Sequence, residues 1–225
     1  FDLPYLFKAT DSAWSVMDEW LGQDRCEALE GSGFKGLGFY GNGEYMIGSN
    51  KKLVHPEDAK GLRIRAHSSQ LQCDSLSSIG ANPLSVAWGD IYTSLQQGTI
   101  DACDNVNNVC IADGYQQYAK YISVMEYATH FNGITMNEKK FESLTPELQD
   151  VITKAAKKAA LDCTKNLETK NAEQLEEMVT GGAEKTDNVD KAAFKEAAQS
   201  VYDKFLSNNE QGAKYYEAIT ALAAK

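Results

Sequence analysis

Two arginines in the segment GLRIRAHSS, residues 61–69, are the side chains best suited to bind an organic anion. The segment is typical of a strand, along which side chains alternate between faces, so Arg63 and Arg65 share one face, opposite Ile64. A guanidinium fork offers parallel N–H donors that match a carboxylate, and it stays charged. The residues alone leave a solvated face or a structural ion pair open as alternatives.

Two more side chains come at the ends of predicted strands. Asn105 follows the segment TIDAC and is expected to cap the helix that begins there, and Trp88 ends the extended segment ANPLSVAW. In open α/β sheets, ligands bind outside the carboxyl ends of the strands. An arginine, an asparagine and an aromatic side chain at three strand ends therefore predict a pocket for a small molecule.

Signatures of other chemistry are absent or misplaced. GSGFKG at residues 31–36 follows a predicted helix and precedes a strand, whereas the dinucleotide-binding fingerprint needs the reverse order. The sequence has no HExxH and no CxxC, so we expect no metal site and no cofactor. It also lacks GxSxG and any nucleophile–base pair, which argues against an enzyme. The five cysteines are expected to be small apolar residues, with a Cys103–Cys110 bridge as the alternative.

Charge and hydropathy exclude further classes. The 225 residues carry a net charge of −10, which argues against nucleic-acid binding because phosphates need clustered lysine and arginine. No window approaches 18 apolar residues, so we expect no membrane span. The opening FDLPYLFKATD has an acid, a proline and a lysine too early for a signal peptide.

Strand-like and helix-like segments alternate along the whole chain, which predicts an α/β fold with mainly parallel sheets. A helix capped by Thr145 should begin at Pro146 and run to about Met178, a length that suits a rod bridging two lobes. The expected helices are 11–30, 56–60, 68–80, 90–98, 105–119, 145–178, 190–206 and 209–223, and the expected strands are 34–40, 45–50, 62–66, 81–88, 99–103, 122–128 and 133–137, with a turn at 41–44.

The sequence from NGEYMIGSN through GLRIRAHSS to TIDACDNVNN resembles the extracytoplasmic solute-binding proteins of TRAP transporters, the DctP family. FDLPYLF and ITMNEKKFESLTPELQDVI match other segments of that family, so the likeness covers nearly all residues. The family's E-x-Y is Asp90-Ile91-Tyr92 here, and its D-G-x-E-N is Asp101-Ala102-Cys103-Asp104-Asn105. By this resemblance, we expect that the family's first two βα units belong before Phe1.

The resemblance implies a two-lobed clamp. Residues 1–42 and 131–170 would form the remainder of lobe one with the bridging helix, and residues 43–130 and 171–225 would form lobe two. The lobes would close on a small organic acid and deliver it to TRAP membrane subunits, with the protein acting as a periplasmic monomer that performs no catalysis. A ligand-sensing receptor domain of the same fold and, less favoured, a binding protein of an ABC importer are the alternatives.

The resemblance also assigns residues. Arg65 takes the place of the family's carboxylate-binding arginine, with Asn105 as a further donor and Trp88 as an apolar wall. Tyr45 stands where many members carry a second arginine, which implies one strongly bound carboxylate rather than two. Ser68 is also expected among the ligand-binding residues. Arg63 lies one pleat from Arg65, and from that position we expect it to form a structural ion pair with Asp104.

Overall fold

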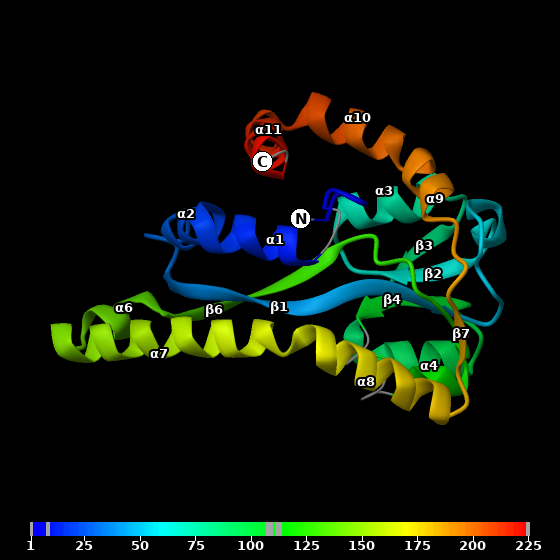
Figure 1. Ribbon diagram of the computed structural model, residues 1–225, viewed down its shortest axis with the longest axis horizontal. Coiled ribbons are helices and arrows are strands. Elements are labelled where there is room, and N and C mark those ends of the chain that lie inside the picture. The colour runs from blue at the N-terminus through cyan, green and yellow to red at the C-terminus, as the bar shows by residue number, and fades with distance from the viewer. Residues whose placement is uncertain (1, 8–9, 107–109, 111–113, 224–225) are drawn as a thin grey trace.

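The computed structural model describes residues 2–7, 10–106, 110 and 114–223. A seven-stranded sheet has the order β3-β2-β4-β1-β5-β7, and β6 pairs with β1 (Figure 1). The strands are β1 Phe34–Ser49, β2 Arg63–Ala66, β3 Asn82–Ser85, β4 Ala102–Val106, β5 Tyr121–Ser123, β6 Thr129–Asn137 and β7 Glu184–Thr186. The α/β class is confirmed.

The prediction of mainly parallel sheets is wrong, because the sheet is mixed. β2 runs parallel to β3 and β4, and β5 runs parallel to β7. The long strand β1, however, is antiparallel to β4, β5 and β6. Alternation of strands and helices along a sequence does not fix the direction of a strand whose neighbours in the sheet arrive much later in the chain.

The predicted turn at residues 41–44 is also wrong, because β1 continues through it as one strand. Its first part pairs with β6, and its last part pairs with β4 and β5. The register with β6 shifts between Gly41 and Gly43, and Gly43 has a φ of 117°. The glycines therefore form a bulge that redirects the strand instead of reversing it.

The helices follow the predicted segments with interruptions. They are α1 Thr10–Val16, a π-helical turn Met17–Leu21, α2 Gly22–Glu27, α3 Gln70–Ser78, α4 Ile91–Gln96, α6 Glu138–Glu142, α7 Pro146–Lys165, α8 Leu167–Thr180, α9 Lys191–Ala197, α10 Gln199–Asn208 and α11 Glu210–Ala223, with short 3₁₀ turns at Pro56–Ala59, Trp88–Asp90 and Tyr115–Gln117. The Thr145 cap is confirmed, since its Oγ1 accepts from the Leu148 amide at 3.5 Å. The predicted long helix breaks at Asn166 into α7 and α8, which run along β1 (Figure 1).

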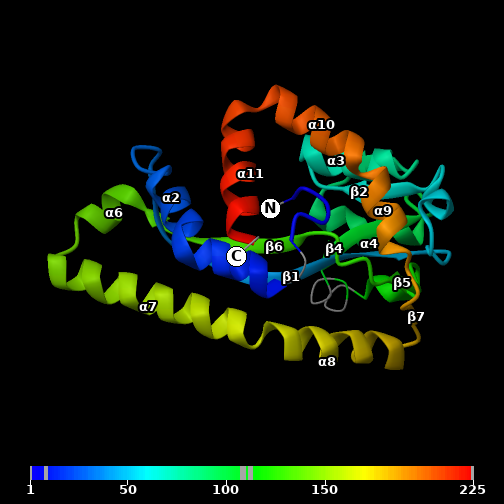
Figure 2. The same ribbon diagram turned by 45° about the horizontal axis from the view of Figure 1, so that its top comes forward.

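Two apolar clusters cover opposite faces of the sheet. On one face Ile47 packs in the same cluster as Ile64, and on the other Met46 packs in the same cluster as Cys103. The C-terminal helices return across the molecule, with α10 against α3 and α11 against α1 (Figure 2). No helix within the described part of the chain has the length and apolar character needed to cross a membrane.

Candidate carboxylate-binding site

Arg65 is a buried cation near the carboxyl end of β2, and the residue is 3% exposed. Its Nε donates to the Val86 carbonyl at 3.2 Å, and its Nη1 lies 3.4 Å from His67 Nε2. Among the described residues no carboxylate forms an ion pair with it, although buried charges in proteins are normally paired. Since a guanidinium carries five N–H donors, this side chain retains capacity for an external anion.

Asn105 lies on the same face of the sheet as Arg65. The parallel register pairs Arg65 with Cys103, and Asn105 comes two residues later in β4. Its amide is 2% exposed; Oδ1 accepts from the Val106 amide at 2.9 Å, and Nδ2 has no hydrogen-bond partner. The predicted helix cap at Asn105 is wrong, because β4 continues to Val106, while most of the rest of the predicted helix 105–119 lies outside the described residues or in a 3₁₀ turn.

His67 connects Arg65 to Tyr45. Its Nε2 is 3.5 Å from the Tyr45 hydroxyl, and the Tyr45 ring centroid lies 5.3 Å from that of His130. Burial raises the pKa of Tyr45 well above its ordinary value and lowers the pKa of both His67 and His130. The sequence prediction missed His67 by treating the histidines as scattered, although His67 comes directly after β2 and two residues after Arg65.

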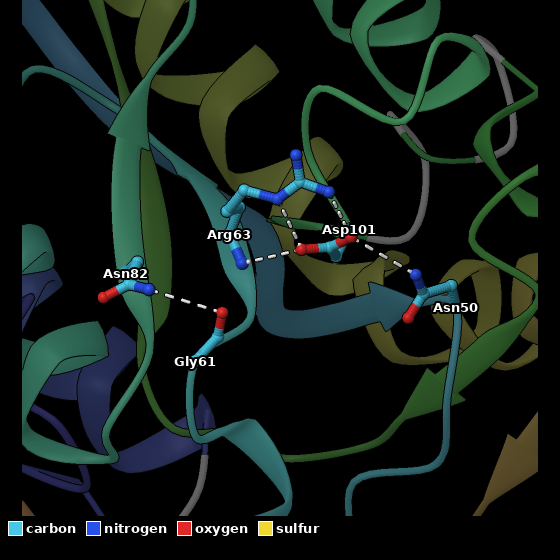
Figure 3. Close-up of polar contacts among 5 residues, drawn as sticks. All are labelled: Asn50, Gly61, Arg63, Asn82 and Asp101. Carbon is cyan, nitrogen blue, oxygen red and sulfur yellow. Dashed lines mark hydrogen bonds and ion pairs between the residues drawn. The ribbon is translucent and has the colours of Figure 1, made fainter.

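The predicted ion pair between Arg63 and Asp104 is wrong, because Arg63 pairs with Asp101 (Figure 3). Its Nη2 donates to Asp101 Oδ1 at 2.7 Å and its Nε to Oδ2 at 2.8 Å. The parallel register pairs Ile64 of β2 with Ala102 of β4. The residues that come directly before them, Arg63 and Asp101, therefore lie side by side. Asp104 lies further along β4 and on the opposite face, out of reach of Arg63.

Asp104 is instead the centre of a buried network that the sequence did not reveal. Its Oδ2 accepts from Gln72 Nε2 at 2.6 Å and from the Tyr127 hydroxyl at 2.5 Å, while Oδ1 has no hydrogen-bond partner. Burial raises the pKa of Asp104 to about 7, although these two hydrogen bonds and the charge of Arg65 act to lower it. A carboxyl that is partly protonated at neutral pH is a weak counter-ion for Arg65.

The remaining predicted residues lie near the same strand ends. Trp88 begins a 3₁₀ turn after β3 and is 50% exposed. Because Arg65 donates to the carbonyl of Val86, two residues earlier, the segment that carries Trp88 is held against the arginine. Ser68 is exposed at the bend between β2 and α3.

Comparisons with known proteins identify the family of this chain. Residues 1–209 match the family described as bacterial extracellular solute-binding protein, family 7. The 2,3-diketo-L-gulonate-binding periplasmic protein YiaO of Escherichia coli is 30% identical over 220 residues, which are 97% of this chain and 67% of that protein. The chain spans 53–67% of the length of the first three curated relatives.

Solved structures of TRAP periplasmic solute-binding proteins have the same fold. The protein from Sulfitobacter sp. NAS-14.1, with bound β-D-galacturonate, is 29% identical with a TM-score of 0.87 and matches 98% of this chain and 71% of that one. The protein from Polaromonas sp. JS666, bound to D-erythronate, is 27% identical with a TM-score of 0.92 and matches 98% and 72%. This chain therefore belongs to the DctP family, family 7 of the bacterial extracellular solute-binding proteins.

Proposed function

We propose that this protein binds a small organic acid between two lobes in the periplasm and delivers it, as a monomer and without catalysis, to the membrane subunits of a TRAP transporter. The observation that carries the proposal is the buried guanidinium of Arg65, which has only a carbonyl and an imidazole as described hydrogen-bond partners. The carboxylates named for the similar solved structures support this ligand class.

The proposed anchor is a bidentate pair between the ligand carboxylate and Arg65. Asn105 Nδ2 is a buried donor without a partner on the same face, so it can supply one further hydrogen bond. Trp88, on the segment held by Arg65, supplies an apolar surface. A buried cation and a buried amide donor both cost free energy while they lack a partner. A carboxylate that hydrogen-bonds to both removes this cost, and its affinity increases accordingly.

The lobes proposed for this clamp are residues 1–42 with 131–170, and residues 43–130 with 171–225. Strands β1 and β6 each cross a boundary between the two proposed lobes. β1 pairs with β6 along its first part and with β4 and β5 along its last part. The ligand would favour the closed arrangement through contacts that it makes only there.

The test is calorimetry on the natural full-length protein with four acids: D-galacturonate, D-glucuronate, D-erythronate and succinate. Arg65→Lys keeps the charge and loses the fork, and one charge-assisted hydrogen bond contributes ~1.5–3 kcal/mol, so affinity should fall about tenfold to a hundredfold. Arg63→Lys is the matched control, because that arginine is already paired with Asp101. No binding of any of the four acids, or equal effects of the two substitutions, would overturn the proposal.

A further inference from the structure

The contacts of His67 define its protonation state. Arg65 Nη1 lies 3.4 Å from His67 Nε2, and the Tyr45 hydroxyl lies 3.5 Å from the same nitrogen. A guanidinium can only donate, so its contact with Nε2 favours a neutral imidazole that has the lone pair on Nε2 and the proton on Nδ1. His67 thus occupies one of the arginine donors that a carboxylate would use.

Most of the charged or titratable groups around His67 favour this neutral state, and Asp2 opposes it. Burial lowers its pKa most, followed by Arg65 on β2 and His130 on β6, whereas Asp2 in the N-terminal segment raises it. Tyr45 on β1 stays neutral because burial raises its pKa. Asp104 on β4 accepts a hydrogen bond from Tyr127, next to β6, and another from Gln72 of α3, whose Oε1 accepts from the His67 backbone amide.

We propose that His67 takes up one proton from solvent when a carboxylate binds to Arg65, and so becomes the second cation of the site. This inference rests on the proposed function. The carboxylate takes the donor of Arg65 that now meets Nε2, and Nε2 gains a proton in its place. The resulting imidazolium then donates to the second carboxylate oxygen or to a neighbouring ligand oxygen, so the charge of the site rises by one as the anion enters.

The consequence for transport is that acid binding and proton binding are linked. A carboxylate beside the imidazole raises the pKa of His67 in the bound state above its value in the free state. Affinity must then increase as pH falls through the interval between these two values, by up to about tenfold per pH unit for one proton. The site would discriminate against neutral sugars, which offer no negative charge to stabilise the imidazolium.

The test is calorimetry of the full-length protein with the same four acids at pH 7, in phosphate and in Tris, whose ionisation enthalpies differ. The difference in observed heat gives the number of protons bound per acid. We expect a positive fraction of one proton in the natural protein and none in His67→Gln. His55→Gln is the matched control, since His55 is half exposed and lies beside Asp190.

Two further variants assign the proton. His130→Gln should retain the uptake, and so should Asp104→Asn. Binding without buffer dependence, or uptake that persists in His67→Gln, would overturn the inference while leaving the proposed function in place. Loss of the uptake in His130→Gln or Asp104→Asn would then show which group takes up the proton. Failure of all four acids to bind would instead overturn the proposed function, and the proton linkage with it.

Discussion

Arg63 and Arg65 show how neighbours decide the role of identical side chains. They lie two residues apart on one strand and share a face, yet Arg63 meets Asp101 in a partly exposed ion pair and Arg65 is buried with no carboxylate among its described partners. The sequence predicts the shared face, but the partner depends on the register between β2 and β4. The type of residue therefore indicates anion binding, and the sheet shows that Arg63 already has a carboxylate partner whereas Arg65 has none among the described residues.

The ranking of Arg65 and Tyr45 can be tested by substitution. The Tyr45 hydroxyl contacts His67 and can contribute one neutral hydrogen bond, worth about 0.5–1.5 kcal/mol. Truncating one partner of a buried charge pair costs about 2–5 kcal/mol. Tyr45→Phe, which keeps the ring and its packing, should thus weaken acid binding at most about tenfold in calorimetry, and Arg65→Ala far more. The reverse ranking would show that the anchor is Tyr45.

Asp104 should make stability depend on pH. Its pKa is about 7 in the folded protein and about 3.9 when unfolded, so the folded state binds more protons between these values. Stability from this group is therefore present below the unfolded pKa and is lost as pH rises to 7. Urea midpoints of the natural protein and Asp104→Asn should diverge in favour of the variant from pH 5 to pH 8. A constant difference across this range would contradict the buried, partly protonated carboxyl.

At the scale of elements, Gly43 marks the point where β1 changes partners. Its φ of 117° is unfavourable for a side chain, and an added Cβ would lie 3.3 Å from Asn171 Oδ1 of α8. Gly43→Ala should destabilise folding by about 1–3 kcal/mol, measured by urea unfolding. Gly89→Ala is the matched control, since nothing lies within 4 Å of its added Cβ. Equal stability of the two variants would mean that the bulge tolerates a side chain.

The sequence could predict the features that depend on neighbouring residues, but not those that depend on distant partner strands or helices. Local signals fixed the start of α7, because Thr145 and Pro146 act within one helical turn. The glycines at residues 41–44 were misread because a turn and a bulge need the same backbone freedom, and the choice depends on whether partner strands lie on both sides. Arg65 was assigned from the family resemblance together with the chemistry of its side chain. The Asp104 network has no local signature, because it joins α3, β4 and the segment before β6.

At the scale of the whole molecule, the C-terminal helices connect regions far apart in the sequence. Lys204 of α10 pairs with Asp74 of α3 at 2.6 Å, and Tyr202 donates to the Pro4 carbonyl at 2.7 Å. Tyr215 of α11 donates to Asp24 at 2.6 Å. These helices thus contact residues from both proposed lobes. Closure of the lobes must therefore either break these contacts or leave them in place.

Closure itself can be measured by small-angle X-ray scattering of the full-length protein. If the acid is held between lobes, its contacts favour the closed state, and the radius of gyration should fall when D-galacturonate, or whichever of the four acids binds, reaches saturation. Arg65→Ala at the same acid concentration should scatter like the ligand-free protein, because the contact that distinguishes the two states is lost. Saturating heat of binding in calorimetry with unchanged scattering would show that the acid binds within one rigid lobe, since a ligand shifts a conformational equilibrium only through contacts that differ between its states.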